Sequence, residues 1–412
     1  MKAWMSLLRS PIFEVPPTAG LPPLWRDLFP SSTPSLAERA AVFVGVDDIQ
    51  IECSGTAALV VALSALRRRS DRMSVVVPAY TCPLVAIAIA HCGLKVRLCD
   101  LAPDHFDMDS AALAAACDND TLAIIPTHLA GRVANVDVAL ACARRVGAFV
   151  IEDAAQALGA RSGTASVGIT GDIGFFSLAA GKGLTLYEGG LLVARDPELR
   201  VQLRRCHDEL VAASAAWEFR RATQLVGYHL LYRPRGLWLA YGWPRRRALN
   251  AGALTAAVGD DFSLSIPLHL VGAWRQGVGA RAFSRLSDFQ YELATRAQQR
   301  ITRLAQIPGV KVLRDGDNAQ GTWPFLLLAM SDQGMRDAAL ARLWSTSLGV
   351  SRLFIHALPD YPYLASIVPR ADVPNARVFA ARTLTISNSP WLDDERFAHI
   401  CRVLEEVTAG SR

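Results

Sequence analysis

The segment of residues 150–193 constrains the rest of this chain more than any other stretch. It reads VIEDAAQALGARSGTASVGITGDIGFFSLAAGKGLTLYEGGLLV and contains two short apolar runs. The first run ends in the acidic pair Glu152-Asp153, and the second ends directly before Ser177. Short apolar runs are typical of buried parallel strands, and α/β proteins bind their ligands at the carboxyl ends of such strands. The segment therefore predicts that Asp153 and Ser177 lie close together at one edge of a parallel sheet.

The lysine that follows favours a cofactor site. Lys182 stands between two glycines in a chain that has only four lysines against 39 arginines, so charge alone does not explain it. Arginine could not replace an amine that must form an imine, because the guanidinium stays protonated. Pyridoxal phosphate (PLP) needs a lysine for that imine, a carboxylate at its ring nitrogen, and hydroxyl or N–H groups at its phosphate. Lys182, Asp153 and Ser177 supply these three parts.

Each of the three residues has a simpler interpretation when it is taken singly. Asp153 could be a helix N-cap, which is a common role of aspartate. Ser177 could be an ordinary loop residue, and Lys182 a solvated charge. We favour the cofactor site because the three residues occur together, in this order and at this spacing.

The motifs of this segment resemble those of the DegT/StrS group of PLP-dependent sugar aminotransferases, which have fold type I of the PLP enzymes. The family motifs are E-D-x-A-Q/H, G-D, S-F/L-x-x-x-K and L-T-x-x-E-G-G. They stand in this chain at Glu152 to Gln156, Gly171-Asp172, Ser177 to Lys182 and Leu184 to Gly190. The resemblance extends from about residue 50 to the C-terminus, apart from one insert.

The resemblance implies an α/β fold: a fold type I large domain whose mostly parallel sheet is flanked by helices, plus a smaller C-terminal α+β domain. The alternation of apolar strands and helices ahead of Asp153 agrees with a mostly parallel sheet. Family members often cover a dimer neighbour with an N-terminal arm. We expect a proline-rich extended arm at 1–34, a large PLP-binding domain at 35–283 with an insert at 204–283, and a small domain with the linker helix at 284–412.

The resemblance also assigns cofactor-binding roles to residues outside the three discussed above. Thr56 and Ala57 follow a strand and a Ser-Gly turn at the start of a helix. They match the residues that bind the PLP phosphate in the family, together with Ser177. Gln156 matches the residue that lies beside the PLP ring and orients it.

Three further assignments come from places where this chain and the family differ or match less closely. The family's aromatic residue that stacks on the PLP ring would fall at Cys82, so Tyr80 is the nearest aromatic candidate. His356 lies in RLFIHALPDYPY, which is similar to the family segment that carries a substrate-contacting histidine, although it could equally be a surface histidine. The Asn of the family's N-Y-R motif, which reaches the neighbour's active site, is absent here, and Arg285 is its candidate substitute.

The resemblance implies an aminotransferase that works as a homodimer. The amino group would pass from glutamate or glutamine to a keto sugar, most often nucleotide-linked, in bacterial surface polysaccharide or secondary-metabolite sugar biosynthesis. Lys182 and Asp153 would be the catalytic residues. Two alternatives stay open: a dehydratase-like PLP reaction, for which relatives carry histidine in place of the lysine, and a catalytically weak PLP-binding scaffold or regulatory protein.

The insert 204–283 interleaves aromatic residues with arginines. Three interpretations compete: helices that pack on the partner subunit, a surface for an anionic substrate, and a helix that contacts a membrane surface. We favour packing, because aromatics at helical spacing usually belong to a core.

Composition argues against several other classes of protein. The net charge of +5 comes from basic residues spread along the chain, which does not indicate nucleic-acid binding. The eight cysteines lack zinc-binding spacing, so we expect reduced thiols and no metal site. The chain shows neither a signal peptide nor an apolar run long enough to span a bilayer, so we expect a soluble, cytoplasmic protein.

Overall fold

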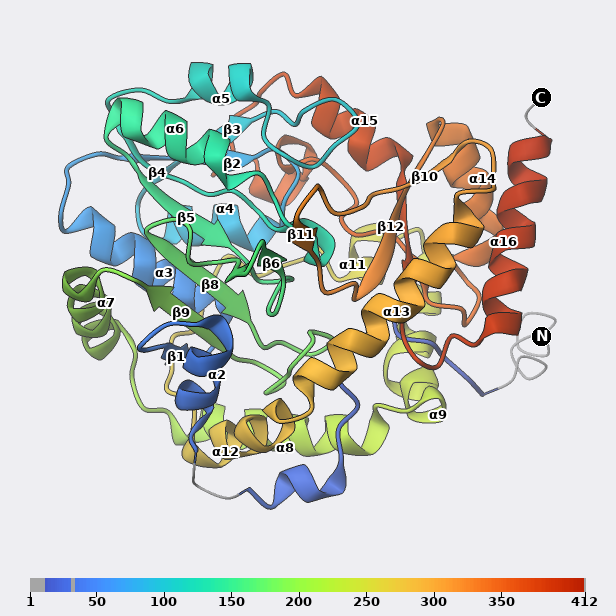
Figure 1. Cartoon of the computed structure of the whole chain (residues 1–412), viewed down its shortest axis with the longest axis horizontal. Helices are drawn as coiled ribbons and strands as arrows, with labels where there is room; N and C mark the ends of the chain where they lie inside the picture. The colour runs from blue at the N-terminus through green and yellow to red at the C-terminus, as the bar shows by residue number, and fades with distance from the viewer. Residues whose placement is uncertain (1–11, 31–33, 411–412) are drawn as a thin grey trace.

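A computed structural model of the chain describes residues 12–30 and 34–410 (Figure 1). Its central element is a seven-stranded sheet with the order β1-β9-β8-β5-β4-β2-β3. Strands β3, β2, β4, β5 and β8 pair in parallel, and β9 is antiparallel to both of its neighbours. This sheet confirms the predicted α/β class. Its strands are β1 (Gln50–Glu52), β2 (Ser74–Pro78), β3 (Lys95–Cys99), β4 (Thr121–Ile124), β5 (Phe149–Asp153), β8 (Ile173–Ser177) and β9 (Gly190–Ala194).

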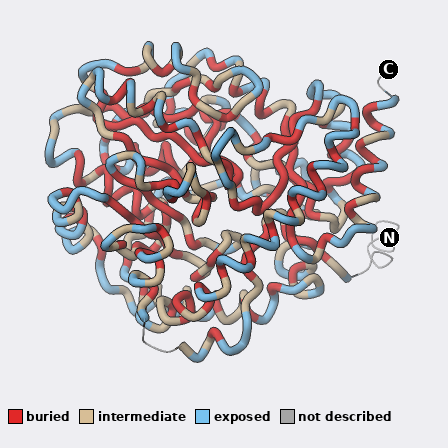
Figure 2. The backbone as a smooth tube through the Cα atoms, in the orientation of Figure 1, coloured by how far each residue is buried: buried red, intermediate tan, exposed pale blue. Residues whose placement is uncertain are grey.

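Helices cover both faces of this sheet. Val75 and Val77 of β2 face one core, and Val76 faces the other, because successive side chains of a strand point to opposite faces. Figure 2 shows the strands as largely buried segments, as expected for a parallel sheet covered on both sides. The first face packs against α3 (Gly55–Arg67), α4 (Pro83–His91) and α7 (Pro197–Leu210), and the second against α5 (Ser110–Ala116) and α6 (Val136–Val146).

A second, antiparallel sheet forms the smaller C-terminal α+β unit. Its order is β10-β12-β14-β13, and the long helix α13 (Leu286–Leu304) runs from the large sheet toward it (Figure 1). The strands are β10 (Val310–Val312), β12 (Phe325–Met330), β13 (Val350–Ser351) and β14 (Thr383–Ser387). The helices are α14 (Gln333–Leu343), α15 (Pro374–Arg382) and α16 (Asp394–Ala409).

Several short elements complete the fold. A three-stranded sheet joins the two units, since β11 (Ala319–Gln320) pairs with β6 (Arg161–Ser162), which pairs with β7 (Ala165–Ser166). The remaining elements before the insert are η1 (Trp25–Leu28), α2 (Leu36–Val44) and η2 (Leu129–Gly131), and those after β13 are η4 (Leu358–Asp360) and η5 (Pro362–Leu364). None of the helices in the described ranges is long and apolar enough to cross a membrane.

The insert is helical, as the sequence predicts, and it packs largely within its own chain. Tyr232 is 4% exposed, and its hydroxyl accepts the Gly20 N–H at 2.9 Å. Its ring packs on Trp391, whereas Trp243 stays 47% exposed. The elements are α8 (Ala215–Leu231), α9 (Pro234–Leu237), the π-helical turn η3 (Trp238–Gly242), α10 (Trp243–Asn250), α11 (Leu254–Val258) and α12 (Ala273–Phe283).

Residues 14–21 of the N-terminal arm contact the insert, the small C-terminal unit and the loop of Lys182. Glu14 is fully buried, and its carboxylate accepts hydrogen bonds from Arg245 at 2.9 Å and Arg246 at 2.6 Å. The arm therefore packs on its own chain, and not only on a neighbouring subunit as the resemblance suggested. Residues 1–11 and 31–33 of the predicted arm lie outside the described ranges.

Glu152, the first acid of the pair that ends β5, has a structural role. Its buried carboxylate accepts the N–H groups of Gly168, Thr170 and Gly171 at 2.8, 2.6 and 2.7 Å, and Nε2 of His128 lies 2.9 Å away. His128 accepts a backbone N–H at Nδ1, so its Nε2 carries the proton that Glu152 accepts. Burial acts to raise the pKa of Glu152, but the hydrogen bonds prevail and lower it. Glu152 thus joins two loops at the carboxyl edge of the sheet.

We expect Glu152→Ala to lower the free energy of unfolding by about 3–5 kcal/mol at neutral pH, because it leaves buried N–H groups without an acceptor. Urea unfolding measures this loss. The matched control is Glu406→Ala, which removes an exposed pair with Arg342 and should cost less than about 1 kcal/mol. Glu152 contributes to the free energy of unfolding at pH values above the ordinary pKa of glutamate. This contribution is lost as the pH falls through the lowered pKa that Glu152 has in the folded protein. Equal losses in the two variants would contradict the structural role.

Candidate active site

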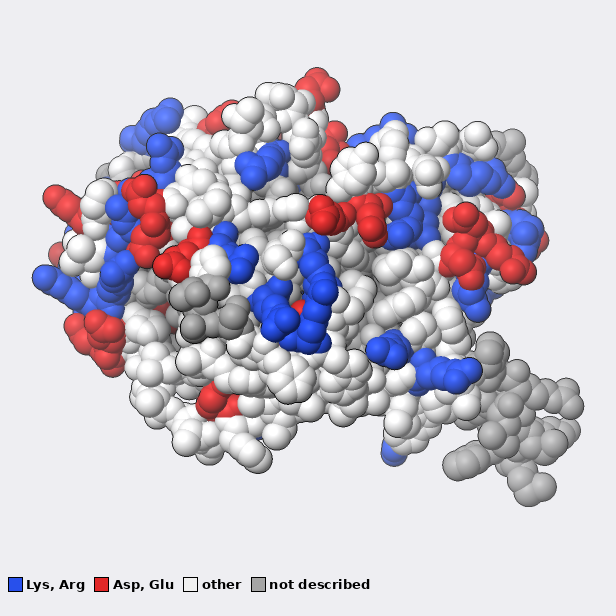
Figure 3. Space-filling model, turned by 60° about the horizontal axis from the view of Figure 1, so that its bottom comes forward, with Lys and Arg blue, Asp and Glu red and all other residues white. Residues whose placement is uncertain are grey.

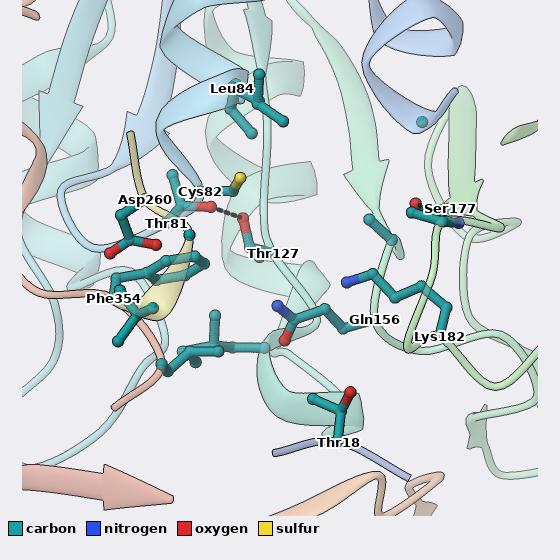
Figure 4. A pocket seen from close by; sticks show the side chains of 18 of the residues that line it. Thr18, Thr81, Cys82, Leu84, Thr127, Gln156, Ser177, Lys182, Asp260 and Phe354 are labelled. Atoms are coloured by element: carbon teal, nitrogen blue, oxygen red, sulfur yellow. Dashed lines mark hydrogen bonds between the residues drawn. The ribbon is translucent and has the colours of Figure 1, made fainter. Parts of the chain in front are cut away.

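A cavity of about 380 Å³ lies where β5 and β8 end, next to the N-terminus of α3 (Figure 4). Asp153 and Ser177 are the last residues of these two paired strands, and Thr56 lies in the first turn of α3. The structure therefore brings together residues that the sequence placed at one sheet edge. The predicted residues that line the cavity are Thr56, Asp153, Gln156, Ser177 and Lys182.

Lys182 reaches the cavity from a loop that the N-terminal arm holds on both sides. The carbonyl oxygens of its flanking glycines accept hydrogen bonds from Oγ1 of Thr18 at 2.8 Å and from the Leu21 N–H at 3.0 Å. Burial lowers the pKa of the Lys182 amine, and the carboxylate of Asp153 opposes this effect. A lowered pKa increases the fraction of neutral amine, which is the form that can make an imine.

Asp153 offers a buried carboxylate without a full set of partners. Its Oδ1 accepts the Ala155 N–H at 3.0 Å, and its Oδ2 has no hydrogen-bond partner among residues 12–30 and 34–410. Burial raises the pKa of Asp153, while the Ala155 N–H and the Lys182 charge act to lower it. A buried carboxylate is stabilised by a nearby cation, and the protonated ring nitrogen of PLP would be such a cation. The carboxylate therefore fits the ring of PLP.

The start of α3 fits the phosphate of PLP. The N–H groups of Gly55 and Thr56 have no partner among the described residues, and a helix N-terminus attracts anions. A Cβ on Gly55 would lie 3.1 Å from Cβ of Ser177, so the glycine allows the helix and β8 to approach closely. Ala57 does not line the cavity, and its N–H donates to Oγ of Ser54 at 2.9 Å. The expected phosphate contact of Ala57 does not fit this placement.

Gln156 lies beside the cavity, between Lys182 and Thr127 in Figure 4. Its Oε1 accepts the Ala130 N–H at 2.7 Å, which fixes the direction of the side chain. The amide is therefore held in place before any ligand binds.

Tyr80 does not line the cavity, so its expected stacking on the PLP ring does not fit the structure. The side chain is 1% exposed, and its hydroxyl makes hydrogen bonds of 3.2 Å with both the O and the N–H of Phe354. Its ring packs edge-on against Phe354 and Phe379. Since Phe354 lines the cavity, Tyr80 supports that wall from behind, and Cys82 lines the cavity at the family's aromatic position.

Neither of the expected substrate-binding residues lines the cavity. His356 is exposed and packs edge-on against Tyr361. Arg285 donates to the carbonyl of Pro22 at 2.9 Å and pairs with the buried carboxylate of Asp27. Arg285 therefore anchors the N-terminal arm in this chain.

The cavity wall also contains residues that the sequence analysis did not assign. The arm, the insert and the small sheet each contribute part of it, and no sequence motif connects these segments with the lysine loop. They are Pro17 and Thr18 from the arm, Tyr241, Val258, Gly259, Asp260 and Phe262 from the insert, and Ser351 to Phe354 at the end of β13.

The sheet, the smaller unit and the cavity agree with fold type I of the PLP enzymes. Residues 31–230, just under half of the chain, match the model of the DegT/DnrJ/EryC1/StrS aminotransferase family.

Relatives and solved structures agree with this assignment. The UDP-N-acetyl-3-dehydro-alpha-D-glucosamine 3-aminotransferase of Acidithiobacillus ferrooxidans is 40% identical over 206 residues, which cover 50% of this chain and 54% of that protein. The spore coat polysaccharide biosynthesis protein SpsC of Bacillus subtilis is 26% identical over 379 residues, covering 90% of this chain and 88% of SpsC. The structure of the sugar aminotransferase CalS13 from Micromonospora echinospora has a TM-score of 0.71 at 22% identity and covers 96% of this chain and 99% of that chain. The matches at 37% to 40% identity to MosB, GDP-perosamine synthase and the A. ferrooxidans enzyme span between 36% and 54% of those relatives.

Proposed function

We propose that the protein is a PLP-dependent aminotransferase that moves an amino group from glutamate or glutamine to a keto sugar. The observation that carries the proposal is the amine of Lys182 in one cavity with the Asp153 carboxylate and the start of α3. The UDP-linked keto sugar named for the A. ferrooxidans relative supports a nucleotide-linked acceptor. The name of SpsC supports a place in surface polysaccharide biosynthesis.

PLP, when bound, supplies an electron sink that weakens the C–H bond next to the amino group of the donor. Lys182 would hold PLP through its amine, and once the donor has replaced it the free amine would take the proton from that carbon and deliver it to the carbon of the cofactor that carries the imine. The lowered pKa of Lys182 suits this role, because only a neutral amine accepts a proton. Asp153 keeps the ring nitrogen protonated, and Gln156 orients the ring. The N–H groups of Gly55 and Thr56, with the hydroxyls of Thr56 and Ser177, bind the phosphate.

We also propose that α13, which begins next to the predicted boundary at 284, is the linker between the large and small domains. The first half of this helix packs in the core of the large sheet, and the second half packs in the core of the four-stranded sheet. Such a helix can couple a movement of one unit to the other. The side chains of the first half are Leu286, Phe289 and Leu293, and those of the second are Ala297, Ile301 and Leu304.

We propose a homodimer as the working form. Large apolar side chains lie exposed on or next to η1 and on α8: Trp25 at 51%, Phe29 at 75%, Phe219 at 73% and Leu230 at 53%. The lower part of Figure 3, where the bottom of Figure 1 comes forward, carries few charged side chains. Exposed apolar side chains of this kind are typical of a protein interface.

Two half-reactions test the proposed function. The protein loaded with PLP and mixed with glutamate or glutamine alone should convert the bound PLP to pyridoxamine phosphate, which visible absorption and mass analysis detect. A keto sugar should then reverse the change and leave the reaction as an amino sugar. A protein that converts its PLP with neither amino acid would contradict the proposal, and loss of water from the sugar without use of an amino donor would indicate the dehydratase-like alternative.

A further inference from the structure

Asp260, which belongs to the insert, lies in the wall of the active-site cavity across from Lys182. Both residues line the cavity, and Figure 4 shows them on opposite sides of it. Asp260 is only 3% exposed, so its carboxylate is part of the built wall and not of the protein surface. Buried carboxylates are rare unless they are paired or bind something, so this one requires an explanation.

One oxygen of Asp260 is held by the chain, and the other is not. Its Oδ2 accepts the hydroxyl of Tyr361 and the N–H of Ile355, both at 2.7 Å. The hydroxyl of Tyr363 donates to the backbone carbonyl of Asp260 at 2.6 Å. Its Oδ1 has no partner among residues 12–30 and 34–410. The carboxylate is therefore fixed in direction and has one acceptor atom free.

Part of the cavity wall that contains Asp260 is apolar, and its polar members Thr81 and Arg352 make their hydrogen bonds elsewhere. Leu84, Val258, Phe262 and Phe354 line the same cavity and offer no side-chain hydrogen-bond donor. Burial raises the pKa of Asp260 to about 6, against the opposing effects of Tyr361, the Ile355 N–H and Arg352. At neutral pH the group is thus mainly an anion that gains from any donor a ligand brings.

We propose that Oδ1 of Asp260 accepts a hydrogen bond from a ring hydroxyl of the keto sugar and so selects polyhydroxylated acceptors. This inference rests on the proposed function. Amino transfer takes place at Lys182, so the opposite wall meets the part of the acceptor that lies away from its carbonyl group. A carboxylate only accepts hydrogen bonds, and the hydroxyls of a sugar are neutral donors. The side-chain carboxylate of glutamate would be repelled at this position.

The decisive variant is Asp260→Asn, because an amide can keep the internal contacts while it changes the free atom. Its carbonyl oxygen can still accept from Tyr361 and Ile355, and its NH2 group then replaces the free acceptor with a donor. The matched control is Tyr361→Phe, which removes the hydroxyl that donates to Oδ2 and accepts the N–H groups of Ile355 and His356, and which leaves Oδ1 unchanged.

The experiment measures the two half-reactions separately in the full-length protein loaded with cofactor. The probes are glutamate and glutamine as donors, and UDP-N-acetyl-3-dehydro-α-D-glucosamine, scyllo-inosose and 3-ketoglucose as acceptors. Asp260→Asn should lower kcat/KM for the acceptor that the wild type uses best by about 10- to 100-fold. Asp260→Asn should change the rate of the donor half-reaction by less than about threefold. Tyr361→Phe should change the rate of each half-reaction by less than about threefold.

A set of deoxy analogues of the best acceptor then identifies the hydroxyl. With the wild type, the analogue that lacks the recognised hydroxyl should react about 10- to 100-fold more slowly than its parent acceptor. With Asp260→Asn, the same analogue and its parent should react equally fast. Equal loss of both half-reactions in Asp260→Asn and in Tyr361→Phe would show that Asp260 only supports the loop, and would overturn the inference. So would a wild type that tolerates removal of every hydroxyl. Both of these outcomes would leave the proposed function intact, whereas a wild type that aminates only keto acids, or that converts PLP with no donor, would overturn the proposed function as well.

Discussion

Replacing Lys182 by arginine should abolish amino transfer while the protein stays folded. The guanidinium keeps the positive charge and much of the side-chain volume, but it stays protonated and cannot form an imine or accept a proton. Loss of the proton transfer alone corresponds to about 10²–10⁴-fold in rate, and loss of the covalent attachment adds to it. The half-reaction with glutamate or glutamine, followed by absorption, measures the effect.

Lys311→Arg is the matched control for that experiment. Lys311 is an exposed residue of β10 and does not line the cavity, so its replacement should leave the half-reaction unchanged. Turnover by Lys182→Arg within tenfold of the wild type would be incompatible with the role of the lysine.

Replacing Asp153 by asparagine should give the second-largest loss. The amide can still accept the Ala155 N–H, so the turn after β5 should persist. It carries no negative charge, so a protonated ring nitrogen loses the partner that stabilises it. We expect the donor half-reaction to slow by about 10²–10⁴-fold, with part of the PLP still bound, because the phosphate site at α3 is unchanged.

Stopped-flow measurement of the half-reaction and equilibrium dialysis of PLP separate these two effects. The control is Asp261→Asn, since Asp261 is exposed and does not line the cavity. If Asp153→Asn reacts as fast as the control, the carboxylate does not act on the ring.

The positions of Asp153, Ser177 and Lys182 could be predicted from the sequence alone, because the position of each depends on local structure. Strand ends of a parallel sheet meet at one edge, so a residue that ends a strand is placed as soon as the strand is recognised. The role of Thr56 was predicted from the family resemblance, and the strand and Ser-Gly turn before it predicted its place at the start of a helix. The alternation of strands and helices predicted a mostly parallel sheet, although the antiparallel pairing of β9 on both sides was not foreseen.

Side-chain direction explains why Tyr80, His356 and Arg285 do not line the cavity of their own chain. A motif match gives the position of a residue along the backbone, whereas tertiary contacts decide where its side chain points. Tyr80 bonds to Phe354, which is 274 residues away in the chain, and Arg285 pairs with an arm residue 258 positions away. No local pattern contains such information.

The insert shows the same limit on a larger scale. Its helices were predictable from apolar spacing, but its contribution to the cavity depends on contacts with distant segments. The ion pair between Glu14 and Arg245 joins residues 231 positions apart. The direction of the Asp260 carboxylate is fixed by hydrogen bonds from Tyr361 and Ile355, which are also distant in the sequence. The two-residue strands β6, β7 and β11 are too short to show a period of two.

The measurement that tests the central claim most directly is reduction of the PLP-loaded protein with borohydride, followed by peptide mapping by mass spectrometry. Reduction fixes the cofactor to the amine that carries it. We predict that the added mass is on the peptide that contains Lys182 and is absent from Lys182→Arg. Attachment at Lys95 or Lys311, or no attachment in a protein that has bound PLP, would contradict the account.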